Sequence, residues 1–374
     1  LYNSIYTRAL IQFVPYYEPI LFNLEGWILI NRLCLPITLK GKPIRNRIVL
    51  PPMVLFGKST NAGYVTEKHI EHYKARARGG AGLIIVEATS VQLNGRLSND
   101  QLGIWSDEHI GGLRSIVEAC HAHGAKVMLQ IHHAGTKTPQ GVCKSPLSTS
   151  SNISEMQTIK DDFVKGALRA YKAGFDGIEL HGAHGYLLNQ FASSETNNRI
   201  DEYGGDLKGR MKMSLDIIRD IKSELDHGDF IIGYRMGGNE PTLKDGIQIA
   251  KLLEDAGVDL LHVSAGIGSP GIPHPDTPSG FPFNWIVYCG IEVKRNVSIP
   301  VIVVNGIRTR DQASMIIENR LADFVAVGQS QLVDPSWANK TIQKLDVVKC
   351  LECKPRCRWF ESGDLCPHNI LSNK

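Results

Sequence analysis

The sequence lacks the features of a membrane protein and of a nucleic-acid-binding protein. Its 374 residues contain no apolar run of eighteen or more, so no transmembrane helix is predicted. Neither sign of charge is in excess, since Lys and Arg number 41 against 38 Asp and Glu, for a formal net charge of +3. This balance predicts neither nucleic acid nor a membrane surface as a partner. The hydrophobic content of 43% is typical of a globular protein with a sizeable core.

The first residues do not show the pattern of an export signal. Residues 1–32 are apolar and aromatic, but Pro15, Glu18 and Pro19 interrupt them, and they lack the basic region and cleavage pattern of a signal peptide. The first methionine of the chain is Met53. We interpret residues 1–32 as a leader outside the folded domain, either non-native or mis-started, or the tail of something upstream. A helical lid is the alternative.

Cysteine is sparse outside the C-terminus. Four of the eight cysteines are scattered along the chain, namely Cys34, Cys120, Cys143 and Cys289. Without an export signal, these residues predict reduced thiols and a cytoplasmic protein.

From residue 36 onward, apolar strands alternate with amphipathic helices. Strands are predicted at 47–51, 82–87, 126–131, 177–180, 230–235, 259–263, 300–304 and 324–327. Helices are predicted at 66–79, 107–123, 160–174, 208–225, 243–256, 284–296 and 310–319. Eight such units predict a (β/α)8 TIM barrel over residues 33–345, followed by a cysteine-rich segment at 346–374. A doubly wound sheet is the alternative, but no glycine-rich dinucleotide motif follows the first strand.

One stretch, residues 176–205, concentrates proton-active side chains. The strand predicted at 177–180 is followed within six residues by His181, His184 and Tyr186. Catalytic groups of a TIM barrel lie at the carboxyl ends of its strands. A single histidine there is more often structural, but two imidazoles and a phenol together favour binding a polar substrate and moving a proton.

Other predicted strand ends favour a phosphorylated cofactor. Gly306 and Gly328 follow the seventh and eighth strands, whose loops form the usual phosphate site of this fold. Arg235 ends the fifth strand as a lone cation, for which a structural ion pair is the alternative role. Together with the amide of Gln130, these residues favour flavin mononucleotide, since a cation and amides can bind its ring.

These residues resemble those of the old yellow enzyme family of FMN-dependent NADH:flavin oxidoreductases. The resemblance covers about residues 36–345. Its most specific motifs are HGAHGYLLNQF at 181–191 and NRIDEYGG at 198–205. Weaker support comes from NRIVLPPM at 46–53, GLIIVEA at 82–88, LQIHHAG at 129–135 and VGQSQLVDP at 327–335.

The resemblance implies an NAD(P)H-dependent ene-reductase. It implies that His181 and His184 bind the carbonyl oxygen of an enone or enoyl thioester, and that Tyr186 donates the proton. The implied flavin contacts are Pro51, Pro52, Met53, Val54, Ala88, Gln130, Arg235, Asn305, Gly306, Gly328 and Gln329.

Three positions depart from the family pattern. Val54 replaces a Cys or Thr near the flavin, and Phe56 stands where some relatives have a substrate-contacting Tyr. Gln329 replaces the Arg that usually follows the glycine of the eighth strand, which removes a cation from the phosphate site. The affinity and the potential of FMN are therefore expected to differ from those of other members.

The remaining cysteines crowd the C-terminus with the spacing C-x2-C-x3-C-x8-C. They are Cys350, Cys353, Cys357 and Cys366. Four thiolates at short spacing predict a [4Fe–4S] cluster, with structural zinc as the alternative. The segment resembles that of the larger branch with 2,4-dienoyl-CoA reductases and trimethylamine dehydrogenase, in which a second flavin domain follows. Such a domain is expected to be absent or cut off here.

Two other functions stay open at this point. One is an amine dehydrogenase of the trimethylamine type, against which the histidine pair argues. The other is a flavin and iron–sulfur electron-transfer subunit, in which Tyr186 would be idle. The sequence also leaves open a homo-oligomer or a redox partner.

Overall fold

Eight parallel strands close into a barrel in the computed structural model, which describes residues 31–225, 228–267, 274–354, 357–361 and 365–368. The strand order is β10-β3-β4-β5-β6-β7-β8-β9. The strands are β3 (Ile48–Leu50), β4 (Leu83–Ser90), β5 (Lys126–His132), β6 (Gly177–Gly182), β7 (Ile231–Gly237), β8 (Leu260–Ser264), β9 (Val301–Val304) and β10 (Phe324–Ala326). The TIM barrel prediction is confirmed. The predicted leader falls almost wholly outside the described residues.

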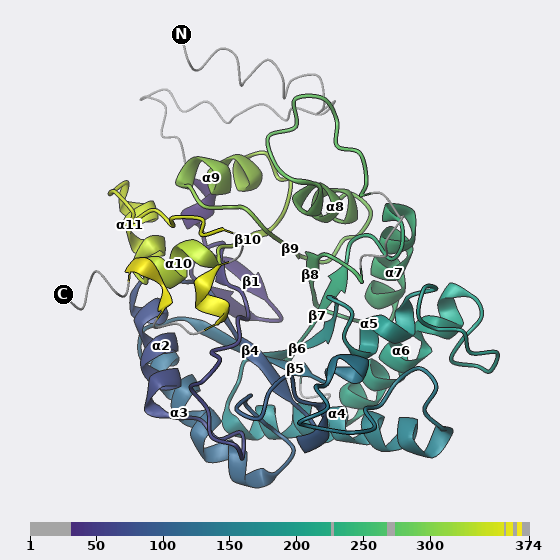
Figure 1. Ribbon diagram of the computed structural model, residues 1–374. Helices are drawn as coiled ribbons and strands as arrows, with labels where there is room; N and C mark the ends of the chain where they lie inside the picture. Colours follow the sequence, from purple (N-terminus) through teal and green to yellow (C-terminus); the bar gives the residue numbers. More distant parts are fainter. Residues whose placement is uncertain (1–30, 226–227, 268–273, 355–356, 362–364, 369–374) are drawn as a thin grey trace.

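The helices form a ring around the strands (Figure 1). The predicted ones are α2 (Glu67–Arg78), α3 (Ile110–His121), α4 (Ile153–Ala173), α6 (Leu207–Glu224), α7 (Leu243–Asp255), α8 (Trp285–Lys294) and α9 (Arg310–Glu318). Helix α4 starts earlier than predicted because Asn152 caps it, accepting a hydrogen bond from the Glu155 amide. Short helices that the sequence did not predict are α5 (Leu187–Ala192), α10 (Gln329–Val333) and α11 (Trp337–Gln343).

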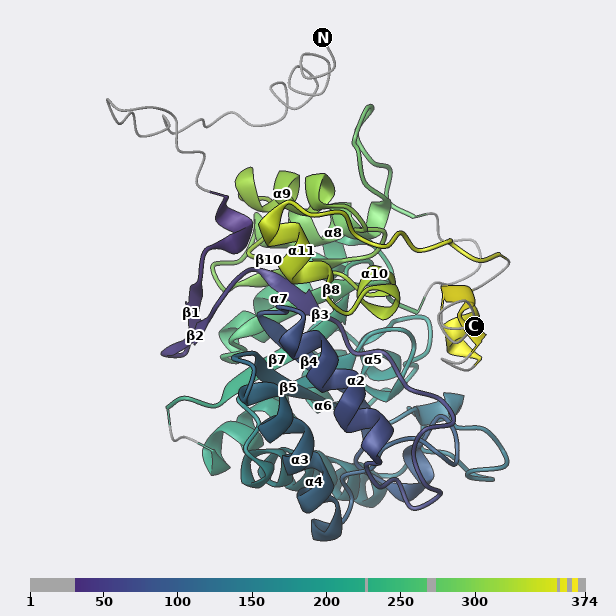
Figure 2. The ribbon, with the colours of Figure 1, turned by 90° about the vertical axis from the view of Figure 1, so that its left-hand side faces the viewer.

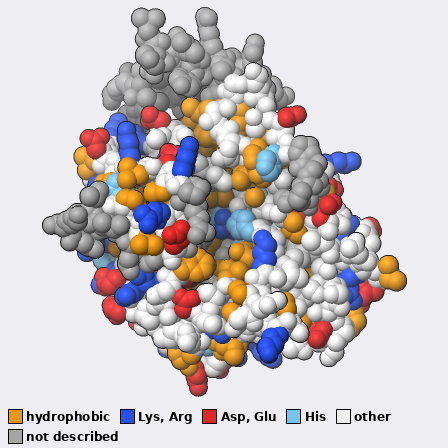
Figure 3. Space-filling model, viewed as in Figure 1, with side chains coloured by type: hydrophobic (Ala, Val, Ile, Leu, Met, Phe, Trp, Pro, Cys, Tyr) orange, Lys and Arg blue, Asp and Glu red, His pale blue; other side chains and the backbone are white. Residues whose placement is uncertain are grey.

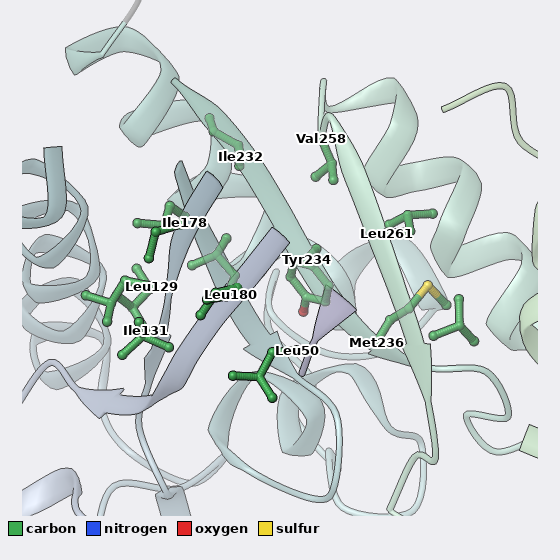
Figure 4. Close-up of a cluster of buried hydrophobic side chains, with 14 of the residues drawn as sticks. Leu50, Leu129, Ile131, Ile178, Leu180, Ile232, Tyr234, Met236, Val258 and Leu261 are labelled. Carbon is green, nitrogen blue, oxygen red and sulfur yellow. The ribbon is translucent and has the colours of Figure 1, made fainter. Parts of the chain in front are cut away.

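Successive side chains along each strand point alternately outward and inward, which produces two separate apolar cores. Side chains such as Leu129, Leu180 and Tyr234 point outward from the barrel and pack under the helices (Figure 4). Their neighbours along the strands, such as Met128 and Ile231, point inward and fill one end of the barrel. Since the alternation continues along the strands, the inward positions nearer the carboxyl ends carry the polar residues.

A two-stranded hairpin closes the amino end of the barrel. It consists of β1 (Ile37–Leu39) and β2 (Lys42–Ile44), joined through Lys40 and Gly41, both at positive φ. Its side chains Leu39 and Ile44 are buried in the cluster that fills the barrel interior. In the side view the hairpin lies at one end of the barrel and the C-terminal segment toward the other (Figure 2). Any ligand must therefore enter at the carboxyl end.

The chain after α11 returns along α10 and α2 to the carboxyl end of the barrel. The amide of Val348 donates to Asp334 Oδ2 at 2.9 Å, and Trp359 packs against His72 of α2 with ring centroids 5.8 Å apart. Trp359 belongs to the short helix η5 (Arg358–Phe360). Across the part of the chain that the structure describes, no helix is both long and apolar enough to cross a membrane.

Candidate active site

A cavity of about 480 Å³ opens at the carboxyl ends of the strands. Its size lies within the usual range for small-molecule sites. Every predicted flavin contact lines it, and so do His181, His184 and Tyr186. Figure 3 looks onto this face, where histidine and basic side chains gather in a central hollow. The fold thus brings together residues from across the whole chain, as the rule of strand ends predicts.

The two histidines and the tyrosine form one cluster at the mouth of β6. The ring centroids of His181 and His184 are 5.1 Å apart, and those of His181 and Tyr186 are 4.8 Å apart. His184 and Gly185 both have positive φ, which turns the chain sharply between the strand and α5. The Asn189 side chain fixes this turn by accepting from the Gly185 amide at 2.7 Å. This turn therefore places both imidazoles next to each other at the cavity.

Both imidazoles are neutral donors. Burial lowers the pKa of His181 and of His184 well below 6.5, and nearby Arg235 lowers both further. Nδ1 of His181 accepts from the Ala183 amide at 3.4 Å, which assigns its proton to Nε2. Nε2 of His184 lies 2.7 Å from Ser264 Oγ, which itself accepts from Arg235. Ser264 can then donate to His184 Nε2, which leaves the His184 proton on Nδ1.

The phenol of Tyr186 is held in its protonated form. Burial raises the pKa of Tyr186 above its ordinary value, with Arg235 acting in the opposite direction. The ring packs edge-on against His132, at a centroid distance of 4.6 Å, and the ammonium of Lys137 lies 5.3 Å from its centre. Tyr186 is therefore positioned and protonated for the role of an acid.

The cavity floor fits the ring of a flavin. Arg235 is only 8% exposed, and its Nε is buried without a hydrogen-bond partner. Among the described residues, the hydrogen bond that its side chain makes is a long one, of 3.4 Å to Ser264 Oγ. A buried guanidinium with free donors needs an anionic or strongly polar group, which a flavin ring supplies. The neighbouring amide of Gln130 is also buried and lines the same floor.

The opposite wall fits a phosphate. Gly306 has a φ of 71°, and a side chain at Gly328 would press on Met53 and Pro51 at 3.2 and 3.4 Å. Glycine at these two turns lets backbone N–H groups approach an anion closely.

Sequence reasoning missed the cation at this wall. Arg308, four residues beyond β9, lines the cavity, and its Nη2 donates to Gln329 Oε1 at 3.2 Å. The Nε of Arg308 is buried without a partner. An arginine in the loop after the seventh barrel strand was the available signal, since that loop belongs to the usual phosphate site. The cavity also takes in Phe56, Leu97, Ser264, Val304, Ile307 and Ala326.

A second cavity lies behind Gln329, against α10. All four C-terminal cysteines line it, together with Leu332, Val333 and Trp359. Burial raises the pKa of Cys350, and the nearby Arg308 acts in the opposite direction. Among the described residues, no three potential ligands stand close enough together to hold a metal ion. The four cysteines share one cavity, but the [4Fe–4S] cluster or zinc site that their spacing predicted stays a prediction.

The comparisons with known proteins agree with this geometry. A sequence model of the NADH:flavin oxidoreductase / NADH oxidase family matches residues 32–347. The chain is 43% identical over 337 residues to the NADH oxidase of Thermoanaerobacter brockii, which covers 84% of this chain and 51% of that protein. It is 39% identical over 320 residues to the NADPH dehydrogenase of Halalkalibacterium halodurans, which covers 82% of this chain and 92% of that one. The chain thus spans about half of the first relative and nearly all of the second.

Two solved structures share the fold. The old yellow enzyme homologue from Zymomonas mobilis aligns with a TM-score of 0.73 and 26% identity, over 85% of this chain and 94% of that one. A 2-naphthoyl-CoA reductase in complex with 2-naphthoyl-CoA aligns with a TM-score of 0.77 and 21% identity, over 88% of this chain and 54% of that one. The second likeness concerns the fold alone.

Proposed function

Since the chain belongs to the NADH:flavin oxidoreductase / NADH oxidase family, we propose that it reduces the activated C=C bond of an α,β-unsaturated carbonyl compound or thioester. Membership implies FMN as the cofactor and NAD(P)H as the reductant. One observation carries the choice of substrate: two neutral imidazoles and a protonated phenol meet in the flavin-sized cavity.

Each residue has a distinct part in this reaction. Bound FMN would supply hydride transfer from NAD(P)H to the β-carbon of the alkene, which oxidises the nicotinamide and reduces the C=C bond. Nε2–H of His181 and Nδ1–H of His184 donate to the carbonyl oxygen, where negative charge develops. Tyr186 gives its phenolic proton to the α-carbon and regains one from solvent.

A Tyr186→Phe variant tests this assignment. The two half-reactions are followed separately under anaerobic conditions, with cyclohex-2-enone as the alkene. Because only the alkene needs the phenol, flavin reduction by NAD(P)H should stay near the wild-type rate. Reoxidation by the enone should fall about 100-fold or more, as expected for the loss of a general acid. Tyr64→Phe is the matched control, since Tyr64 bonds to Glu108 outside the cavity. Reoxidation at the wild-type rate in Tyr186→Phe contradicts the assignment.

We also propose that the C-terminal segment holds a [4Fe–4S] cluster, with zinc as the alternative. The support is that Cys350, Cys353, Cys357 and Cys366 line one cavity beside the flavin site, and that Gln329 lines both cavities. Anaerobic purification followed by iron, sulfide and zinc analysis tests it. About four irons and four sulfides per chain are expected. One zinc per chain selects the alternative, and protein with neither metal overturns the proposal.

A further inference from the structure

A buried carboxylate lies directly beneath the floor of the flavin cavity. Glu179 of β6 is 1% exposed and does not itself line the cavity, whereas its neighbours Gln130 and Arg235 do. Oε1 of Glu179 accepts from Nε2 of Gln130 at 2.7 Å, and Oε2 lies 2.8 Å from Nδ1 of His262. These are the shortest side-chain contacts that Gln130 and His262 make.

The strand register explains why these residues meet. Gln130 of β5 lies opposite Glu179 of β6, and Arg235 of β7 lies opposite His262 of β8. The inward position of β7 beside Glu179 is Gly233, which has no side chain. Because nothing projects from Gly233, the carboxylate on β6 can reach across to the imidazole on β8.

The network carries one negative charge. Burial lowers the pKa of His262, so its neutral imidazole donates through Nδ1–H, and its Nε2 is buried without a partner. Burial lowers the pKa of Arg235, and the negative charge of Glu179 opposes this shift, so the carboxylate lies within electrostatic reach of the guanidinium.

The same bonds fix the direction of the Gln130 amide. Its Nε2 is turned down toward Glu179, which leaves Oε1 as the acceptor that faces the cavity. A carboxylate cannot donate, so the opposite orientation of this amide would place two oxygens against each other.

We propose that Glu179 is a positioning residue that sets the redox potential of the bound flavin, an inference that rests on the proposed FMN site. It acts in two ways: it holds the Gln130 amide with its oxygen toward the ring, and it offsets the charge of Arg235. Reduced flavin is an anion at neutral pH. Arg235 stabilises this anion less when the negative charge of Glu179 partly offsets its own positive charge. Glu179 therefore lowers the redox potential of the flavin.

The potential of FMN-loaded protein, measured by spectroelectrochemistry, tests this inference. Glu179→Gln removes the negative charge and leaves Arg235 in place, so the potential should rise. A change of about tenfold in the ratio of reduced to oxidised flavin corresponds to about 30 mV for a two-electron couple. His262→Gln is the matched control, because it alters the same network without changing its charge, and its potential should move much less.

A second variant separates charge from shape. Glu179→Asp keeps the charge but is too short to reach both partners, so the potential should stay near that of the wild type while FMN binds more weakly. An unchanged or lower potential in Glu179→Gln overturns the proposal. The proposal is also overturned if the potential of Glu179→Asp rises as far as the value expected for Glu179→Gln. This result decides the question even if Glu179→Gln does not fold. Wild-type protein that takes up no FMN contradicts the proposed function instead.

Discussion

Arg308 and Gln329 meet at the phosphate wall of the cavity, where Nη2 of the arginine donates to Oε1 of the glutamine at 3.2 Å. Gln329 occupies the position at which the resemblance to the family implies an arginine. Arg308, in the loop after β9, places a cation beside Gln329 instead. The loops after β9 and β10 thus meet at one wall of the cavity. The pair is partly exposed, and Arg308 also reaches Glu352 of the cysteine-rich segment at 3.4 Å.

This pair predicts a specific effect on flavin affinity. Arg308→Gln should weaken the binding of FMN about tenfold or more, since a hydrogen bond to a charged group contributes about 1.5–3 kcal/mol. Riboflavin, which has no phosphate, should bind to the variant as it does to the wild type. Fluorescence titration of the flavin-free protein measures both constants.

The neighbouring arginine is the control for this prediction. Arg310, at the start of α9, does not line the cavity, so Arg310→Gln should leave both affinities unchanged. An equal loss of FMN and riboflavin binding in Arg308→Gln would mean that the arginine supports the fold and not the phosphate.

A buried carboxyl beside the flavin site predicts a pH-dependent stability. Burial raises the pKa of Glu87 to about 8, against hydrogen bonds from Leu55 and Tyr73 that lower it. Between pH 4.5 and 8 the unfolded chain is then ionised at this residue while the folded chain holds the proton, so stability falls as the pH rises through this window. Glu87→Gln has no such proton to lose, and its loss of stability over this window should be smaller by a few kcal/mol.

Thermal midpoints of the FMN-saturated protein at pH 5, 7 and 9 measure this difference. Glu118→Gln, exposed on α3, should follow the wild-type profile. Parallel profiles for Glu87→Gln and the wild type would show that Glu87 is already ionised in the folded protein.

The loop after α5 depends on one buried amide. Asn197 Nδ2 donates to the carbonyl oxygens of Phe191 and Tyr203, both at 2.7 Å. Asn197→Ala leaves these carbonyls unpaired and should cost about 1–3 kcal/mol of unfolding free energy. Asn198→Ala, next in sequence but exposed, should cost much less. Urea unfolding compares the two, and equal losses would refute the role of Asn197.

The sequence predicted the barrel and most of the cavity because both follow from local patterns. Apolar strands alternating with helices identify the fold, and residues at or just beyond the end of a strand, such as His181 and Gly306, lie at the carboxyl end of the barrel. The hairpin of β1 and β2 was missed, since strands of three residues are too short to show a period. Glu179 was missed because its role depends on His262, a partner on another strand that only the register brings close. Arg308 was missed although it stands in the loop after the seventh strand, because its bond to Gln329 of α10 follows only from the fold.

The cysteine-rich segment was predicted only in part. Its spacing predicted a metal centre, and all four cysteines line one cavity, but no three potential ligands among the described residues stand close enough together to hold a metal ion. The distances between the thiols depend on how the segment packs against α10 and on Trp359. This packing cannot be predicted from the spacing of the cysteines in the sequence.

The central claim is tested most directly by an anaerobic two-step titration of the FMN-loaded wild-type protein. NADH or NADPH is added until the visible flavin absorption is bleached, and cyclohex-2-enone is then added without oxygen. The account predicts that the absorption returns with one cyclohexanone formed per flavin. Flavin that is not bleached by either nucleotide, or that is reoxidised only by oxygen, contradicts it.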